Sequence, residues 1–166
     1  IFIFFALHYN LITDGNIVSQ TYDWIPTLGI QLSFYLDGLS LTFALIISFV
    51  GFAVFLYAGK YMSGNKYLTR FYVYIIVFMS SMLGLVLSDD IITMFVFWEL
   101  TSISSYLLIG FNHDKERSRS AALQALLITG GGGLALLAGL ILIANISGGW
   151  SISNLADLND LITTDK

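Results

Sequence analysis

Four long apolar stretches dominate the chain. They occupy residues 38–59, 71–88, 91–111 and 121–145, and each has close to the ~20 apolar residues that a helix needs to cross ~30 Å of hydrocarbon. Only Asp89 and Asp90 separate the second stretch from the third, so we expect a tight turn between two antiparallel neighbouring helices. The pattern predicts an all-α polytopic membrane protein with four complete transmembrane helices.

The segments outside these stretches have other patterns. Residues 1–7 are apolar but too short to span, and they lack a starting Met, so we interpret them as the tail of a truncated transmembrane helix in a larger protein. Residues 8–37 alternate between apolar and polar beside turn residues, which predicts a small β-hairpin on the outer face of the membrane. Residues 146–166 place leucines at helical spacing between charges, which predicts a short interfacial helix on the same face.

The composition strengthens the membrane prediction and excludes other classes. Of the 166 residues, 57% are hydrophobic and 11% charged, which is more apolar than a soluble domain. A net charge of −4 leaves no basic stripe for nucleic acid. The chain has no Cys, and its two His residues, His8 and His113, are far apart. We therefore expect no nucleic-acid partner, no cofactor and no metal site, and we interpret both His residues as surface groups.

The basic residues indicate which side of the membrane each loop occupies. Six of the seven Lys and Arg residues fall in two loops, residues 60–70 and 112–120. The positive-inside rule predicts that both loops are cytoplasmic, in a multi-pass protein of the cell membrane. The hairpin region, the Asp89–Asp90 turn and the tail then lie outside.

Glu99 is the candidate functional residue, because no other Asp, Glu, Lys, Arg or His lies inside a predicted span. It falls near the middle of the third span, where a carboxylate costs at least ~2.5 kcal/mol and usually marks an ion or proton path. Ser102 and Tyr106 follow at i+3 and i+7, on the same helical face. We predict a proton relay at Glu99 with these hydroxyls as neighbours. The alternative is a structural Glu that bonds to a neighbouring helix.

The fourth span carries two weaker signals. Gln124 could orient water or donate to a carboxylate near Glu99, or it could form an interhelical hydrogen bond. The four glycines at 130–133 lack the Lys and Ser/Thr of a phosphate loop, so nucleotide binding is not supported. Gly131, Ala135 and Gly139 form a ridge of small residues that predicts close contact with another helix.

With this topology in place, the segment MLGLVLSDDIITMFVFWELTSISSYLLIGF resembles the proton-translocating antiporter-like family. That family includes membrane subunits of respiratory complex I and the large subunits of Mrp-type Na⁺/H⁺ antiporters. The segments FYLDGLSLTFALI and HDKERSRSAALQALLITGGGGLALLAGLIL are most similar to the branch that contains the A-type subunits of Mrp antiporters. The resemblance covers essentially the whole chain, but only an early part of a far longer family chain.

The resemblance implies a large helical bundle of inverted repeats in a hetero-oligomeric complex, in which an intramembrane Glu works with a Lys on a later helix. Glu99 matches that Glu, and the Lys partner lies beyond residue 166. Many relatives carry Lys in the fourth span, where this chain has Gln124. The implied function is transport, not enzymatic catalysis: protons and monovalent cations cross the bilayer, with proton movement coupled to Na⁺ efflux. The alternatives are a proton-pumping subunit of an NADH dehydrogenase or membrane-bound hydrogenase, and a structural membrane scaffold.

Overall fold

The computed structural model describes residues 1–13, 17–28 and 30–152. Within them lie five α-helices: α1 (Phe2–Thr13), α2 (Gly38–Tyr61), α3 (Leu68–Leu87), α4 (Ile91–Ile109) and α5 (Glu116–Ser147). Helices α2 to α5 are long and apolar enough to cross a membrane. The predicted fold class, with four spanning helices and a small hairpin, is confirmed. The predicted interfacial helix after residue 152 lies outside the described residues.

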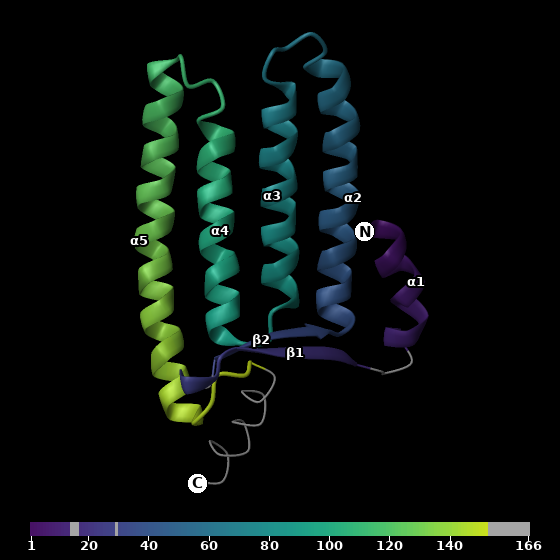
Figure 1. The fold of residues 1–166 in the computed structure, drawn as a ribbon, viewed down its shortest axis with the longest axis vertical. Helices are drawn as coiled ribbons and strands as arrows, with labels where there is room; N and C mark the ends of the chain where they lie inside the picture. Colours follow the sequence, from purple (N-terminus) through teal and green to yellow (C-terminus); the bar gives the residue numbers. More distant parts are fainter. Residues whose placement is uncertain (14–16, 29, 153–166) are drawn as a thin grey trace, which may run out of the picture.

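The helices stand side by side in chain order (Figure 1), so each long helix packs mainly against its sequence neighbours. Helix α1 lies beside the lower half of α2, where the Phe2 and Phe49 rings are 6.2 Å apart. The arrangement is a row of helices. It leaves large apolar side chains exposed along α2 and α5, as expected of surfaces that face lipid or further helices.

A two-stranded antiparallel hairpin crosses one end of this row, which we call the hairpin end (Figure 1). It comprises β1 (Val18–Ile25), a 3₁₀ turn (Pro26–Leu28) and β2 (Ile30–Leu36). The backbone N–H of Asp89, in the α3–α4 turn, donates to the Ser33 carbonyl on β2 at 2.9 Å. The segment after α5 pairs with the same turn: the Ile91 N–H donates to the Trp150 carbonyl at 2.9 Å, and the Ile152 N–H to the Asp89 carbonyl at 2.6 Å. Hairpin, turn and tail are thus joined through their backbones.

Two aspartates begin helices at this end. The Asp37 carboxylate accepts hydrogen bonds from the Ser40 N–H and hydroxyl, both at 2.8 Å, and the Ser40 hydroxyl accepts from the Asp37 N–H. Burial alone would raise the pKa of Asp37, but these hydrogen bonds outweigh it and hold the pKa below its usual value. Asp90, which is 4% exposed, caps α4 by accepting from the N–H groups of Ile92 and Thr93, both at 2.9 Å.

The opposite end, which we call the basic end, holds the two basic loops, and the helix boundaries there differ from the predicted ones by two to five residues. Helix α5 begins at Glu116, five residues before the predicted start at 121. The charged residues 116–119 were predicted as loop because they are polar, but they extend the apolar helix by about one turn into the aqueous phase. Glu116 lies in the first turn, where a negative charge favours the helix dipole.

Glycines set the spacing between neighbouring helices, although not the glycines that the sequence indicated. A Cβ on Gly51 would collide with Met79 across α2–α3, and a Cβ on Gly84 would collide with the Phe97 ring across α3–α4. By contrast, nothing lies within 4 Å of a Cβ on Gly131 or Gly139. The predicted ridge through those two glycines meets no helix among the described residues, and its contact with a helix of the rest of the protein stays a prediction. Helix α5 meets α4 along a different stripe: Ala122, Gly133, Leu140 and Ala144.

Candidate functional site

Glu99 lies in the middle of α4, at the ninth of its 19 residues. The side chain is partly buried and reaches the α4–α5 interface, where its Oε1 contacts Gly133 on α5. This oxygen is buried and has no hydrogen-bond partner. Glu99 therefore combines burial, a midspan position and an unsatisfied carboxyl oxygen.

Gly133 makes the space for this carboxyl group. A Cβ at Gly133 would overlap Glu99 Oε1, would lie 3.2 Å from Glu99 Cδ and would lie 3.6 Å from the Trp98 indole nitrogen. The preceding glycines, Gly131 and Gly132, have nothing within 4 Å of the same position. Of the glycines in this run, only Gly133 faces Glu99. Because Gly133 has no side chain, α5 has a notch there that receives the Glu99 carboxyl.

No basic residue neutralises Glu99 within the part of the chain that the structure describes. The one ion pair found there joins His113 and Asp114, with 3.4 Å between His113 Nε2 and Asp114 Oδ1. An isolated carboxylate at midspan is costly, because neither water nor a cation compensates its charge. The described residues thus leave the Glu99 carboxyl in the notch without a compensating positive charge.

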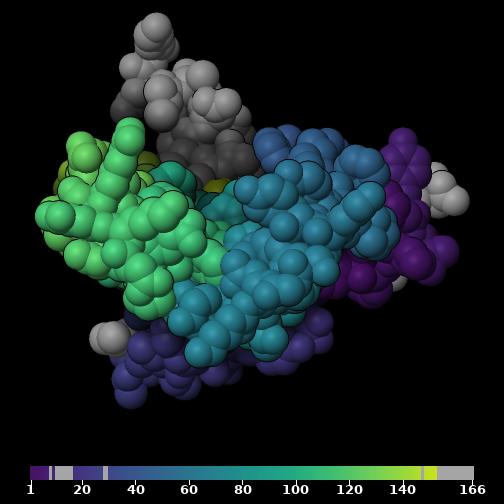
Figure 2. Space-filling model, turned by 90° about the horizontal axis from the view of Figure 1, so that it is seen from above, coloured from purple at the N-terminus to yellow at the C-terminus, as the bar shows by residue number. Residues whose placement is uncertain are grey.

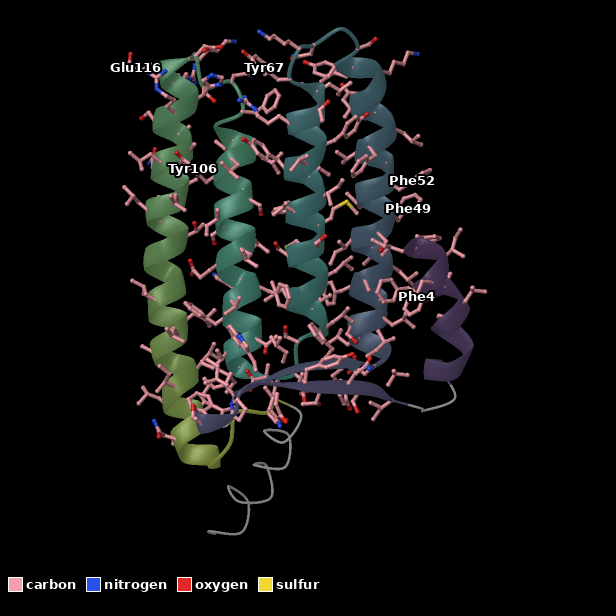
Figure 3. The ribbon with its side chains drawn as sticks, viewed as in Figure 1. Phe4, Phe49, Phe52, Tyr67, Tyr106 and Glu116 are labelled. Carbon is pink, nitrogen blue, oxygen red and sulfur yellow. The ribbon has the colours of Figure 1, made fainter. Side chains whose placement is uncertain are left out.

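Ser102 and Tyr106 extend from Glu99 towards the basic end. Ser102 is 7% exposed, and its hydroxyl donates to the Trp98 carbonyl of its own helix at 3.3 Å. Tyr106 is partly buried and lines a pocket of about 190 Å³ between α3, α4 and α5. In Figure 3, Tyr106 lies in the upper part of α4, below the basic end marked by Tyr67 and Glu116. The two hydroxyls thus lie between the buried carboxyl and an opening at the basic end.

Gln124 is not brought to Glu99. It is exposed on α5, nine residues before Gly133, and nine residues at 3.6 per turn place it about half a turn away from the notch. It therefore faces the side of α5 opposite to α4, away from the predicted relay.

The pocket beside Tyr106 contains charged residues that the sequence alone indicated only as topology signals. Arg70 and Tyr74 line it from α3, His113 from the α4–α5 loop and Arg119 from α5. The Arg70 Nη2 group donates to the Phe111 carbonyl at 2.9 Å and lies 3.2 Å from His113 Nδ1. The i, i+4 spacing of Arg70 and Tyr74 could have indicated part of this pocket from the sequence, because it places both side chains on one face of α3.

The described residues contain no group of three or more His, Cys, Asp or Glu side chains arranged to hold a metal ion. The Asp, Glu, Lys and Arg side chains of the described residues lie instead near the two ends of the helix row, apart from Glu99. Among these charged groups, the Glu99 carboxyl is the one that lies at midspan.

Comparisons with known proteins relate this arrangement to membrane transport complexes. Residues 88–164 match the family described as NADH:quinone oxidoreductase/Mrp antiporter, TM, and residues 24–72 match NADH-ubiquinone oxidoreductase (complex I), chain 5 N-terminus. A relative from Alkalihalophilus pseudofirmus, named as the A-type subunit of a Na⁺/H⁺ antiporter, is 42% identical over 100% of this chain and 21% of its own length.

Two solved structures share the fold. A chain of the Mrp complex from Dietzia sp. DQ12-45-1b superposes with a TM-score of 0.70 at 32% identity, over 84% of this chain and 15% of that one. A chain of the archaeal membrane-bound sulfane sulfur reductase superposes with a TM-score of 0.78 at 21% identity, over 98% of this chain and 25% of that one. The chain spans about a fifth of the length of the curated relatives that it matches.

Proposed function

The chain belongs to the family that Mrp antiporter subunits share with membrane subunits of complex I, and from this premise we propose that it works as part of a monovalent cation/proton antiporter subunit. In this proposal Glu99 is the proton carrier, and proton movement is coupled to Na⁺ efflux. The resemblance to the A-type antiporter subunits extends over the whole chain, and the relatives are named as transport subunits, not enzymes. The bilayer and the other subunits of the complex are the partners.

The buried Glu99 oxygen in the Gly133 notch is the observation that carries the proposal. A carboxyl group with no hydrogen-bond partner is not an interhelical bond that stabilises packing, which argues against a structural scaffold. Such a group gains a partner when a cation or water approaches and loses it when either leaves. A proton relay requires that the surroundings stabilise the charged form of the Glu99 carboxyl at one step and its neutral form at another.

Protons would reach Glu99 from the basic end. Tyr106 follows Glu99 by seven positions, or about 10 Å along α4, and Ser102 lies between them. Water in the pocket lined by Tyr106 would shorten the remaining distance. If the loops at this end face the cytoplasm, as the positive charge favours, this route is the cytoplasmic half of the path.

The test uses the complete protein in its assembled complex, in inverted membrane vesicles that hold a pH gradient. Addition of NaCl should release protons from wild-type vesicles, measured with a pH-sensitive dye. Glu99→Gln keeps the size of the side chain and removes the titratable proton, so it should abolish or severely reduce exchange while assembly stays normal. Glu99→Asp should keep part of the activity.

Glu116→Gln is the matched control, because Glu116 is exposed in the first turn of α5. It makes the same chemical change outside the notch and should exchange at the wild-type rate. Normal exchange by an assembled Glu99→Gln complex would show that Glu99 is structural and would refute the relay.

A redox-driven proton pump is the second candidate, since the matched family includes complex I subunits. The same vesicles separate the two functions. An antiporter responds to a Na⁺ gradient without a reductant, whereas a redox pump acidifies vesicles on addition of NADH and leaves the Na⁺-dependent signal absent.

A further inference from the structure

The pocket at the basic end has the properties of a binding site in its own right. It has a volume of about 190 Å³ and lies where α3, the end of α4 and the start of α5 meet. Figure 2 looks onto this end, where the green start of α5 lies beside the teal loop between α2 and α3. The basic side chains that line it are those of Arg70, His113 and Arg119, and no Asp or Glu side chain is among its lining residues.

Both arginines keep free hydrogen-bonding capacity. The Arg70 Nη2 group donates to the Phe111 carbonyl and contacts His113 Nδ1, but the Arg70 Nε is buried without a hydrogen-bond partner. The Arg119 Nη1 group donates to the His113 carbonyl at 2.7 Å. Within the described ranges neither arginine forms an ion pair with a carboxylate. Two guanidinium groups thus border one pocket with unused donors and without a counter-ion.

The aromatic surroundings fix one of these groups in place. The Arg70 guanidinium lies 4.7 Å from the centre of the Tyr67 ring, 5.1 Å from that of Phe111 and 5.9 Å from that of Tyr74. Contacts of this kind restrict the side chain before any ligand arrives, so little rotamer entropy remains to be lost on binding. Tyr74 and Tyr106 line the same pocket, and each carries a hydroxyl that can donate a hydrogen bond.

The location favours an anion at the membrane surface. The pocket opens where the apolar helices end, which is the level of the lipid headgroups. The pocket at the hairpin end has the opposite character, because Asp37 and Asp89 line it. Arginine forks match the oxygens of a phosphate group and bind it with charge-assisted hydrogen bonds.

We propose that the pocket formed by Arg70, His113 and Arg119 with Tyr74 and Tyr106 binds a phosphate group. The phosphate is that of an anionic phospholipid headgroup or a free phosphate ion, and both offer the same oxygens to the two guanidinium groups. This binding does not depend on the relay at Glu99.

The test uses photoreactive phosphatidylglycerol added to the purified, delipidated complete complex. Peptide mass spectrometry maps the label, and labelling of residues 70–74 and 106–122 is the readout. Loss of one arginine contact removes about 1 kcal/mol, or about fivefold in affinity. Arg70→Gln and Arg119→Gln should each lower labelling at half-saturating probe several-fold. Arg117→Gln is the matched control, because Arg117 is exposed in the same turn but does not line the pocket.

Each outcome has one meaning. Loss of labelling in both pocket variants and retention in Arg117→Gln supports the site. Competition by excess inorganic phosphate then identifies free phosphate as a ligand, and absence of competition identifies the lipid headgroup. Equal labelling by a photoreactive diacylglycerol, which has no phosphate group, or an equal loss in Arg117→Gln, would overturn the proposal. If Arg70→Gln fails to assemble, Arg119→Gln decides alone, because Arg119 is exposed.

Discussion

Gly133→Ala should separate the function of the notch from the stability of the helix. An added Cβ would occupy the place of Glu99 Oε1, so the carboxyl group must move away from α5. The substitution raises helix propensity by about 1 kcal/mol, and a displaced Glu99 side chain in a strained rotamer costs about 0.5–1.5 kcal/mol. These two terms nearly cancel, so we expect normal assembly and a thermal midpoint close to wild type.

The effect on transport should be much larger. A displacement of about 1 Å in a reacting group costs about 100-fold in rate, which corresponds to nearly complete loss of Na⁺-dependent proton exchange in inverted vesicles. Gly132→Ala is the control, because a Cβ there meets nothing within 4 Å. It gains the same helix propensity and should transport at the wild-type rate. Equal activity of Gly133→Ala and Gly132→Ala would refute the idea that the notch positions Glu99.

Three further predictions concern stability, each measured by thermal unfolding of the complete solubilised protein. Gly84→Val should destabilise by about 1–3 kcal/mol because its side chain collides with the Phe97 ring, whereas Gly130→Val has open space and should be at least as stable as wild type, because Val has a slightly higher helix propensity than Gly; equal losses in both variants would contradict this. Asp90→Ala should cost about 1 kcal/mol by removing the cap of α4, and Asp90→Asn less; no loss in either variant would show that the cap is unimportant. The pKa of Asp37 is lower in the folded protein than its ordinary value of 3.8, so the hydrogen bonds to its carboxylate stabilise the fold above that pH and are lost as the pH falls through the folded pKa. The difference in thermal stability between wild type and Asp37→Asn should therefore disappear in acid. A difference that does not change with pH would contradict this.

The helices and the hairpin could be predicted from the sequence, because bilayer thickness and backbone hydrogen bonding leave few alternatives for long apolar runs. The rotation of α5 about its own axis could not be predicted from the sequence. Its residues 121–146 are apolar or small on every side apart from a few polar groups, so no stripe marks the face that meets α4. Gly131 and Gly133 looked equivalent by type, and only the packing shows that Gly133 faces Glu99.

The basic pocket was missed for a different physical reason. Charge counts gave Arg70 a role in topology, which depends only on the side of the membrane on which it lies, and His113 was interpreted as a surface group. Their contact depends on how the loop after α4 folds back over α3, and it joins residues 43 positions apart. Periodicity within one helix carries no information about such a contact.

The backbone bonds that join hairpin, α3–α4 turn and tail make the hairpin end a pivot. The basic end depends instead on side-chain contacts such as that of Arg70 with the Phe111 carbonyl. A helix of 19 residues is about 28 Å long, so a tilt of about 5° about a fixed lower end moves its upper end by about 2.5 Å. Glu99, halfway along, moves by about half of that distance. A tilt of α4 about the hairpin end would therefore displace Tyr106 and Glu99 together, so the pocket beside Tyr106 and the Gly133 notch are geometrically linked.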